Sequence, residues 1–365
     1  MHPRNPLHCL IPDYMLREIA RRSGGTERDA ALDSLGISAT LRSARAQAEA
    51  GRAAIGSVRL PSAPLRAPRV DRVIRDAASG TDLAAPIVRR EGDPDSGDPA
   101  VDEAFEHFGS TWSFFFEVLA RNSIDNAGMT LDGVVHYGRN FDNAFWDGDQ
   151  MVFGDGSGTL FTRLTQSLSV CAHELGHGVI QFDGPLVYQG QSGALNEHIA
   201  DAFGVMVHQW RHGQTVTEAD WLIGAEILAE GVDGQALRSM KQPGTAYDDD
   251  VLGKDPQPAH MDRYVDTADD NGGVHINSGI PNHVFYLAIE GGTNRVSGLR
   301  VEGVGAANRV QIETVFYRAV TQLLPANATF SMARAATIQA ARDLYDSGSA
   351  AERAMTEAWT AVGVN

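Results

Sequence analysis

The sequence has little cysteine, almost no lysine and no long hydrophobic run. Its 365 residues include two cysteines, Cys9 and Cys171, too few for the disulfide framework of a small secreted protein. No apolar stretch approaches the roughly 18 residues that span a membrane, and the first residues lack the apolar core of a secretory signal peptide. We therefore expect a globular protein with no membrane span and no visible export signal.

Positive charge is scarce in most of the chain. The formal net charge is −17. Residues 1–90 carry 15 arginines against 9 acidic residues, whereas residues 91–365 carry 15 basic against 38 acidic residues. Two differently charged segments therefore share one chain. The acidic segment repels phosphate backbones, which argues against nucleic acid as a partner.

The periodicity of apolar residues divides the chain into a mixed half and a helical half. Residues 13–50 show short helical patterns interrupted at Ser23-Gly24-Gly25, and residues 51–68 have the composition of a linker. A hairpin strand near Arg72, a helix over 101–123 and strand-like runs over 133–163 follow. From about residue 164 the pattern is mostly helical. This order predicts an α+β protein with a β-rich N-terminal half and a mostly helical C-terminal half.

The motif that carries chemistry is His173-Glu174-Leu175-Gly176-His177, within a helical pattern over 164–181. Histidines at i and i+4 project from one face of a helix, so both imidazoles can reach one ion at ~2.0–2.1 Å. Glu174 can hold a metal-bound water without being a ligand. Chance would produce roughly 0.02 such motifs in a chain of this composition. A half-buried structural side chain is the alternative for either histidine alone.

A carboxylate in the next helical pattern completes a candidate zinc site. Glu197 follows His177 after 19 intervening residues. Two imidazoles and one carboxylate leave a fourth position open for water, as in catalytic zinc sites. Asp201, at i+4 from Glu197, can accept the second ring N–H of a ligand histidine; alone it would be interpreted as a solvated charge. Zinc would acidify the water, and Glu174 would pass its proton to the leaving nitrogen of an amide.

From about Arg72 to the C-terminus, these motifs resemble the thermolysin family of zinc endopeptidases, closest to its protealysin-like branch. The resemblance implies a two-domain peptidase that is made as a precursor, with the zinc helix at the bottom of the cleft between the domains. It also implies the roles of five residues. These are His173, His177 and Glu197 as zinc ligands, Glu174 as general base and Asp201 as the partner of His173.

The resemblance assigns further residues to the reaction and the substrate. His275, in Asp270-Asn-Gly-Gly-Val-His275, matches a donor to the oxyanion of the tetrahedral intermediate, and Asp270 matches the carboxylate that orients it. Tyr188 matches a second donor, and Arg238 matches the arginine that binds a substrate carbonyl. A turn histidine and a surface charge are the plainer interpretations of His275 and Arg238.

Two more groups of residues match substrate contacts. Asn143 and Ala144 match the segment that pairs with the substrate backbone. The remaining matches correspond to the family's pocket for a hydrophobic residue after the cleaved bond. They are Phe161, Leu164, Val170 and Leu237. Core packing explains the same four residues equally well. We therefore expect cleavage on the N-terminal side of hydrophobic residues.

One departure from the family concerns calcium. Acidic positions of the family's double calcium site are occupied here by Ser169, His208 and Leu222, and Asp220 alone of the matching places is acidic. We therefore expect that paired site to be absent. Acidic loops such as 248–250 leave other calcium sites open.

The N-terminal segment also fits the family pattern. Ile11-Pro-Asp-Tyr-Met-Leu resembles the Pro-Pro-aromatic-Leu motif of protealysin-like pro-segments, with Asp13 in place of the second proline. Residues 1–60 are expected to be an inhibitory pro-segment whose positive charge complements the acidic body. Cys9 could reach the zinc as a fourth ligand, although a buried or idle thiol is the favoured interpretation.

The resulting prediction is a monomeric zinc endopeptidase that is secreted, as the family resemblance implies. Because no signal peptide is visible, non-classical export and retention in the cytoplasm stay open as alternatives. Residues 61–187 would form the N-terminal α/β catalytic domain that includes the zinc helix, and residues 188–365 the mostly helical domain. One alternative is a non-catalytic protein of the same fold that binds zinc and peptides. It predicts damage to Glu174, His275 or Tyr188, and none is seen. A helical protein with an accidental motif is the other alternative, and metal analysis separates it.

Overall fold

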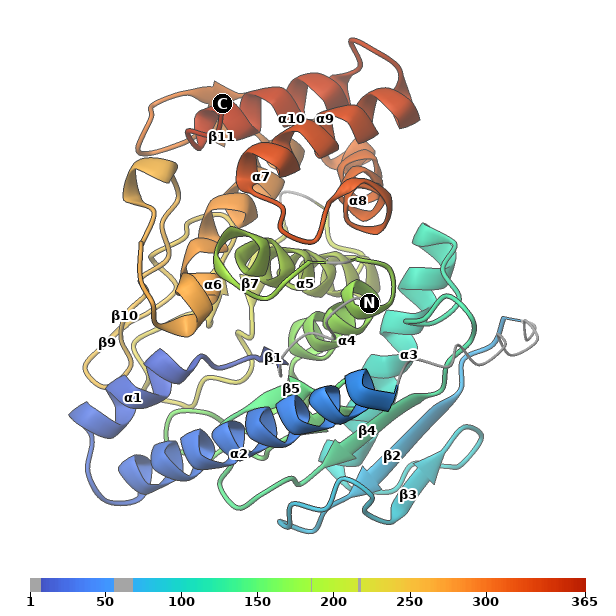
Figure 1. Ribbon diagram of the computed structural model, residues 1–365, viewed down its shortest axis with the longest axis vertical. Helices are drawn as coiled ribbons and strands as arrows, with labels where there is room; N and C mark the ends of the chain where they lie inside the picture. Colours follow the sequence, from blue (N-terminus) through green and yellow to red (C-terminus); the bar gives the residue numbers. More distant parts are fainter. Residues whose placement is uncertain (1–7, 56–67, 185, 216–217) are drawn as a thin grey trace. The chain divides into compact units, whose positions relative to one another are not determined.

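The computed structural model describes residues 8–55, 68–184, 186–215 and 218–365 (Figure 1). The chain forms two compact units. The first comprises residues 1–181, 226–232 and 250–252, and the second comprises residues 182–225, 233–249 and 253–365.

The first unit is built on a sheet of six strands among the described residues, in the order β1-β5-β6-β4-β2-β3. β4 pairs parallel with β2 and β6, and the other pairings are antiparallel. The hairpin of β2 and β3 confirms the strand predicted near Arg72. The strands are β1 (His8–Cys9), β2 (Arg72–Asp76), β3 (Ile87–Arg90), β4 (Leu131–Val135), β5 (Ala144–Trp146) and β6 (Met151–Phe153).

Helices cover both faces of this sheet (Figure 1). Side chains alternate between the two faces along a strand. On one face, Val134 and Val152 belong to a buried hydrophobic cluster, and Ile37 of α2 (Gly25–Ile55) packs against that cluster. Their neighbours face α3 (Pro99–Leu119), where Phe108 packs 6.2 Å from Phe153, centroid to centroid. A Cβ on Gly133 would approach the Phe108 ring to 2.8 Å, so glycine lets this helix pack closely.

The N-terminal segment differs from the prediction in one respect. The break at Ser23 and Gly24 is confirmed, because α1 (Asp13–Arg22) ends there and α2 begins at Gly25. α2 is one continuous helix rather than short pieces, and it reaches Ile55 inside the predicted linker. Alanine and arginine favour helix, and both are frequent up to that point. The rest of the predicted linker, up to residue 67, lies outside the described residues.

The second unit is mostly helical, as predicted. A π-helical segment, Ala319–Leu323, extends α8. The helices are α5 (Gly190–Arg211), α6 (Asp270–Asn277), α7 (Gly279–Glu290), α8 (Arg309–Arg318), α9 (Phe330–Tyr345) and α10 (Ala350–Ala361). Short strand pairs connect them: β7 (Leu222–Ile223) with β8 (Arg238–Ser239), β9 (Asp248–Asp249) with β10 (Gly253–Lys254), and β11 (Gly292–Thr293) with β12 (Arg300–Val301). None of the helices described is both long and apolar enough to cross a membrane.

Candidate active site

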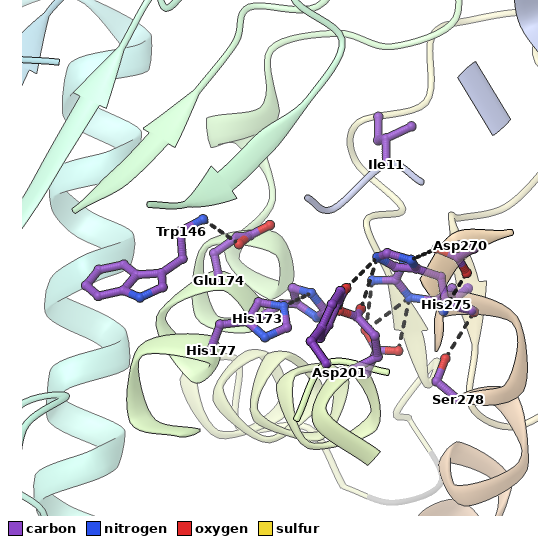
Figure 2. A network of polar contacts seen from close by, with 12 residues as sticks. Ile11, Trp146, His173, Glu174, His177, Asp201, Asp270, His275 and Ser278 are labelled. Atoms are coloured by element: carbon purple, nitrogen blue, oxygen red, sulfur yellow. Dashed lines mark hydrogen bonds and ion pairs between the residues drawn. The ribbon is translucent and has the colours of Figure 1, made fainter. Parts of the chain in front are cut away.

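The His-Glu-x-x-His motif lies on α4 (Leu168–Asp183), which confirms the predicted helix. The Nε2 atoms of His173 and His177 are 3.1 Å apart, and the two ring planes cross at 89°. Two nitrogens that bind one tetrahedral ion at ~2.0–2.1 Å lie about 3.3 Å from each other. The two imidazoles therefore already converge as ligands of one ion do (Figure 2).

Glu197 of α5 supplies the third ligand atom. The candidate ligand atoms of His173, His177 and Glu197 all lie within 4.8 Å of one another, and all three side chains are buried. Among the described residues, this is the one group of three or more His, Cys, Asp or Glu side chains with such spacing. Two imidazoles and one carboxylate are typical of catalytic zinc sites. The donor set fits zinc.

Glu174 lies between the two histidines in sequence and is outside the ligand group. Its Oε2 accepts the backbone N–H of Trp146, the last residue of β5, at 3.0 Å (Figure 2). The Glu174 side chain is fully buried. A carboxylate that a backbone donor holds in one orientation is suited to act as a base toward a water molecule.

In the second unit, His275 lies in a chain of buried polar contacts. Its Nδ1 is 2.6 Å from Asp270 Oδ1, and its backbone N–H donates to Asp270 Oδ2 at 2.9 Å (Figure 2). Its Nε2 lies 3.2 Å from the Tyr188 hydroxyl, which donates to Glu197 Oε1. Burial lowers the pKa of His275, but the charges of Asp270 and Glu197 outweigh burial and raise the pKa to about 9. With Nδ1 held by Asp270, Nε2 is the ring nitrogen that faces the Tyr188 hydroxyl.

A turn with left-handed backbone conformation brings the Asp270 carboxylate into contact with His275. Asp270, Asn271, Gly272 and Gly273 have φ values of 53°, 50°, 82° and 72°. Only glycine, and to a lesser degree Asn and Asp, adopts this region at low cost. A Cβ on Gly273 would also approach Asn277 Nδ2 to 2.8 Å. The sequence Asp-Asn-Gly-Gly is therefore suited to this turn, which returns the carboxylate to the histidine five residues later.

Arg238 of β8 forms a buried ion pair with Asp201 of α5. Its Nε lies 3.0 Å from both carboxylate oxygens, and its Nη2 lies 2.9 Å from Oδ1. Asn282 donates to Asp201 Oδ2 at 2.8 Å and is 2.8 Å from His198 Nδ1. Sequence reasoning missed Asn282 and His198, because neither belongs to a recognisable motif. Burial lowers the pKa of His198 to about 4.

The predicted substrate-pairing residues contact the protein's own N-terminal segment. Asn143 accepts the Ile11 N–H at 2.8 Å and donates to the Ile11 carbonyl at 3.0 Å. The Leu10 N–H donates to the Ala144 carbonyl at 3.0 Å. β1 continues this antiparallel pairing along β5. Leu10 and Ile11 are fully buried. The N-terminal segment therefore occupies the edge of β5.

The four predicted pocket residues are all buried. Phe161, Leu164 and Val170 belong to the first unit, and Leu237 to the second. Leu164 begins a 3-10 turn, Leu164–Gln166, directly before α4. Their burial is equally typical of core residues, so the assignment to a pocket stays a prediction.

Cys9 is a buried thiol, and it is outside the group of candidate metal ligands. It lies opposite Phe145 of β5, and both belong to the cluster that packs against α2. Its Sγ lies 3.9 Å from Ser38 Oγ of that helix. The hypothesis of a fourth ligand is therefore wrong for this structure, because the strand directs this side chain toward α2.

The positions that match the family's double calcium site have local partners. Ser169 lies at a hydroxyl–hydroxyl distance of 2.9 Å from Ser167, and the His208 ring lies 4.4 Å from that of His212. Asp220 accepts the backbone N–H of Leu222 in β7. The absence of that site stays a prediction.

Two buried histidines and a glutamate from one helix, together with a carboxylate from another, are typical of a metallopeptidase site. Comparison with known proteins agrees. The thermolysin metallopeptidase catalytic domain matches residues 91–181, and the thermolysin metallopeptidase alpha-helical domain matches residues 184–364. The chain belongs to the thermolysin family and is a metalloendopeptidase.

Relatives match nearly the whole chain. An extracellular metalloprotease of Pectobacterium carotovorum subsp. carotovorum is 43% identical over 360 residues, 98% of this chain and 97% of the relative. Protease PrtS of a Photorhabdus species is 42% identical over 97% of this chain and 91% of its own length. The solved precursor of protealysin from Serratia proteamaculans is 41% identical, with a TM-score of 0.83 over 98% of this chain and 100% of that chain. These similarities confirm the protealysin-like branch.

Proposed function

We propose that the protein hydrolyses peptide bonds with zinc held by His173, His177 and Glu197, and with Glu174 as general base. The convergence of the two Nε2 atoms at 3.1 Å on one buried helix carries this proposal. Bound zinc supplies Lewis-acid chemistry, which polarises a carbonyl and makes water more acidic. Asp201 is proposed to fix the tautomer of His173.

Glu174 takes a proton from water and transfers it to the leaving nitrogen. The N–H of Trp146 leaves the carboxylate little freedom to rotate. The proposal assigns His275 and Tyr188 to the oxygen of the substrate carbonyl as it gains negative charge. Asp270 keeps His275 oriented through its contacts to the ring and to the backbone N–H. Arg238 binds a neighbouring carbonyl while Asp201 holds its guanidinium.

The N-terminal segment is proposed to be an intramolecular inhibitor. Ile11 and Leu10 pair with Asn143 and Ala144 as a substrate strand would. The relative of known structure is described as a precursor. Removal of residues 1 to roughly 60 would free the edge of β5. The cleavage position lies near or within the residues that the structure does not describe.

Two further proposals follow from the family. A hydrophobic residue after the cleaved bond fits the buried side chains Phe161, Leu164, Val170 and Leu237. Secretion is supported by relatives that are described as extracellular. We also propose that the protein acts as a monomer.

The function is tested with internally quenched peptides that carry Leu, Phe or Asp after the candidate bond. After removal of the N-terminal segment, wild type should cleave before Leu and Phe, lose activity with a chelator and regain it with added zinc. Mass spectrometry of the products locates the bond. Chelator-resistant hydrolysis, or zinc binding without hydrolysis at any peptide, would contradict the proposal.

A further inference from the structure

The side chain of Gln181 joins α4 to the turn after β5. Gln181 lies in the last turn of α4 and is half-buried. Its Oε1 accepts the ring N–H of Trp146 at 3.0 Å, and its Nε2 donates to the carbonyl of Gly148 at 2.9 Å. One amide therefore fixes both the indole ring and the turn that follows it.

The same tryptophan holds Glu174 through its backbone. Trp146 N–H donates to Glu174 Oε2 at 3.0 Å. Glu174, Gly178 and Gln181 are at i, i+4 and i+7, which places them on one face of α4. A Cβ on Gly178 would lie 3.5 Å from two atoms of the Trp146 ring. The ring therefore lies along the helix between the carboxylate and the amide.

Trp146 pairs with both neighbouring strands at this end of β5. Trp146 lies opposite Met151 of β6 on one side and opposite His8 of β1 on the other. If the N-terminal segment leaves, as proposed above, the β1 pairing is lost and β5 becomes an edge strand. β6, the turn after Trp146 and the Gln181 side chain are then among the contacts that hold the Trp146 amide where Glu174 needs it.

We infer that Gln181 is a positioning residue for the reaction, which acts on Glu174 through Trp146. This inference rests on the proposed role of Glu174 as general base. Loss of the amide should leave the binding of substrate in place and misdirect the carboxylate. The expected signature is therefore a lower kcat with little change in KM.

The kinetic test compares Gln181→Met, Gln181→Glu and Trp146→Phe, each produced as the full chain and assayed after removal of its N-terminal segment. Gln181→Met removes both hydrogen bonds and should lower kcat about tenfold, less than the ~100-fold loss from a 1 Å misplacement. Gln181→Glu keeps the acceptor for the indole N–H and should restore part of that loss. The double variant Trp146→Phe/Gln181→Met should be no slower than the worse single variant, because both remove the same contact. Gln166→Met is the matched control, since its amide donates to Thr162 instead.

A second readout does not depend on activity. The chain has 5 tryptophans, and fluorotryptophan labelling gives each a ¹⁹F NMR signal, with Trp146 assigned by Trp146→Phe. In a Glu174→Ala background, which prevents self-cleavage, Gln181→Met should shift the Trp146 signal and leave the others in place.

The outcomes separate this inference from the proposed function. If wild type is active, Glu174→Ala is inactive and Gln181→Met keeps kcat within about twofold of wild type, Gln181 has no positioning role and the proposed function stands. A fall in thermal stability that accounts for the lost activity also overturns the inference. A wild type that hydrolyses no peptide after removal of its N-terminal segment overturns both.

Discussion

The two units contribute to the site in different ways. In the first unit, three functional side chains come from five consecutive residues of one helix, and helical periodicity alone brings His173 and His177 to 3.1 Å. In the second unit, the corresponding side chains come from separate elements, including α5, β8 and α6. There, a buried carboxylate contacts each of two nitrogen-bearing side chains: Asp270 contacts His275, and Asp201 contacts Arg238.

In the proposed mechanism, zinc binding draws mainly on the first unit and transition-state stabilisation on the second. Ligands need short and regular spacing, which a helix provides. Donors to a developing oxyanion must be fixed before the reaction begins, and ion pairs in a buried setting provide that. The first unit should therefore supply two of the three proposed zinc ligands and the base, whereas the second should supply Glu197 and the groups that determine how fast bound substrate reacts.

The largest effect is expected for His177→Ala. Removal of one of three ligands should abolish stoichiometric zinc and lower activity at least ~10³-fold. Metal analysis after dialysis checks it. His212→Ala is the matched control, because His212 also lies four residues after a histidine, His208, yet is exposed and outside the ligand group. Full zinc occupancy in His177→Ala would contradict the assignment.

His275→Ala should separate the two units most clearly. The variant should keep its zinc and lose about 10²–10³-fold in kcat, the usual effect of removing one oxyanion donor. Asp270→Asn should lose less, since the ring remains and only its anchor is weakened. Zinc content and steady-state kinetics together check this. Loss of zinc in His275→Ala at unchanged folding would remove the distinction between the units.

A structural histidine of the first unit gives a pH-dependent prediction. His136 Nδ1 lies 2.8 Å from Asp155, and its Nε2 lies 3.1 Å from Asp98, which caps α3. The hydrogen bond to Asp155 raises the pKa of His136, and nearby acidic charges raise it further. These effects outweigh burial, which lowers the pKa, and the result is a pKa of about 9. Because this pKa is raised on folding, its stabilisation is complete below about pH 6.5 and is lost as the pH rises through 9.

His136→Asn should therefore lower the free energy of unfolding by about 1–2 kcal/mol at pH 6, since the partner carboxylates are partly exposed. At pH 10 the difference should nearly vanish. Thermal unfolding in a Glu174→Ala background measures it, with His212→Asn as control. An equal loss at both pH values would show that the charge of His136 contributes nothing.

The smallest effect concerns the N-terminal segment. Asn143→Ala removes both hydrogen bonds to Ile11, and the hold on that segment should weaken by about 1 kcal/mol, or about fivefold. Hydrogen exchange of the Leu10 and Ile11 amides in a Glu174→Ala background should accelerate accordingly. Thr40→Ala serves as control, because its hydroxyl donates within α2. Unchanged exchange in Asn143→Ala would mean that Asn143 does not retain the segment.

Local features of the molecule could be predicted from the sequence, whereas contacts between residues that are distant in the sequence could not. The α4 motif, the helical second half and the break before Gly25 follow from spacing and turn residues. The continuation of α2 to Ile55 was missed, because alanine and arginine suit a helix as well as a linker. Asn282, His198 and Gln181 were missed because their roles depend on contacts with distant residues, which leave no local pattern.

In the proposed mechanism, Glu174 acts as a base beside a zinc ion that it does not bind. The most direct test is Glu174→Gln, which keeps the size of the side chain and removes its basicity. We expect Glu174→Gln to bind one zinc per chain, as wild type does. Its kcat/KM should be lower by at least ~10³-fold, within the range found when an essential catalytic group is removed. Activity within about tenfold of wild type at full zinc occupancy would contradict it.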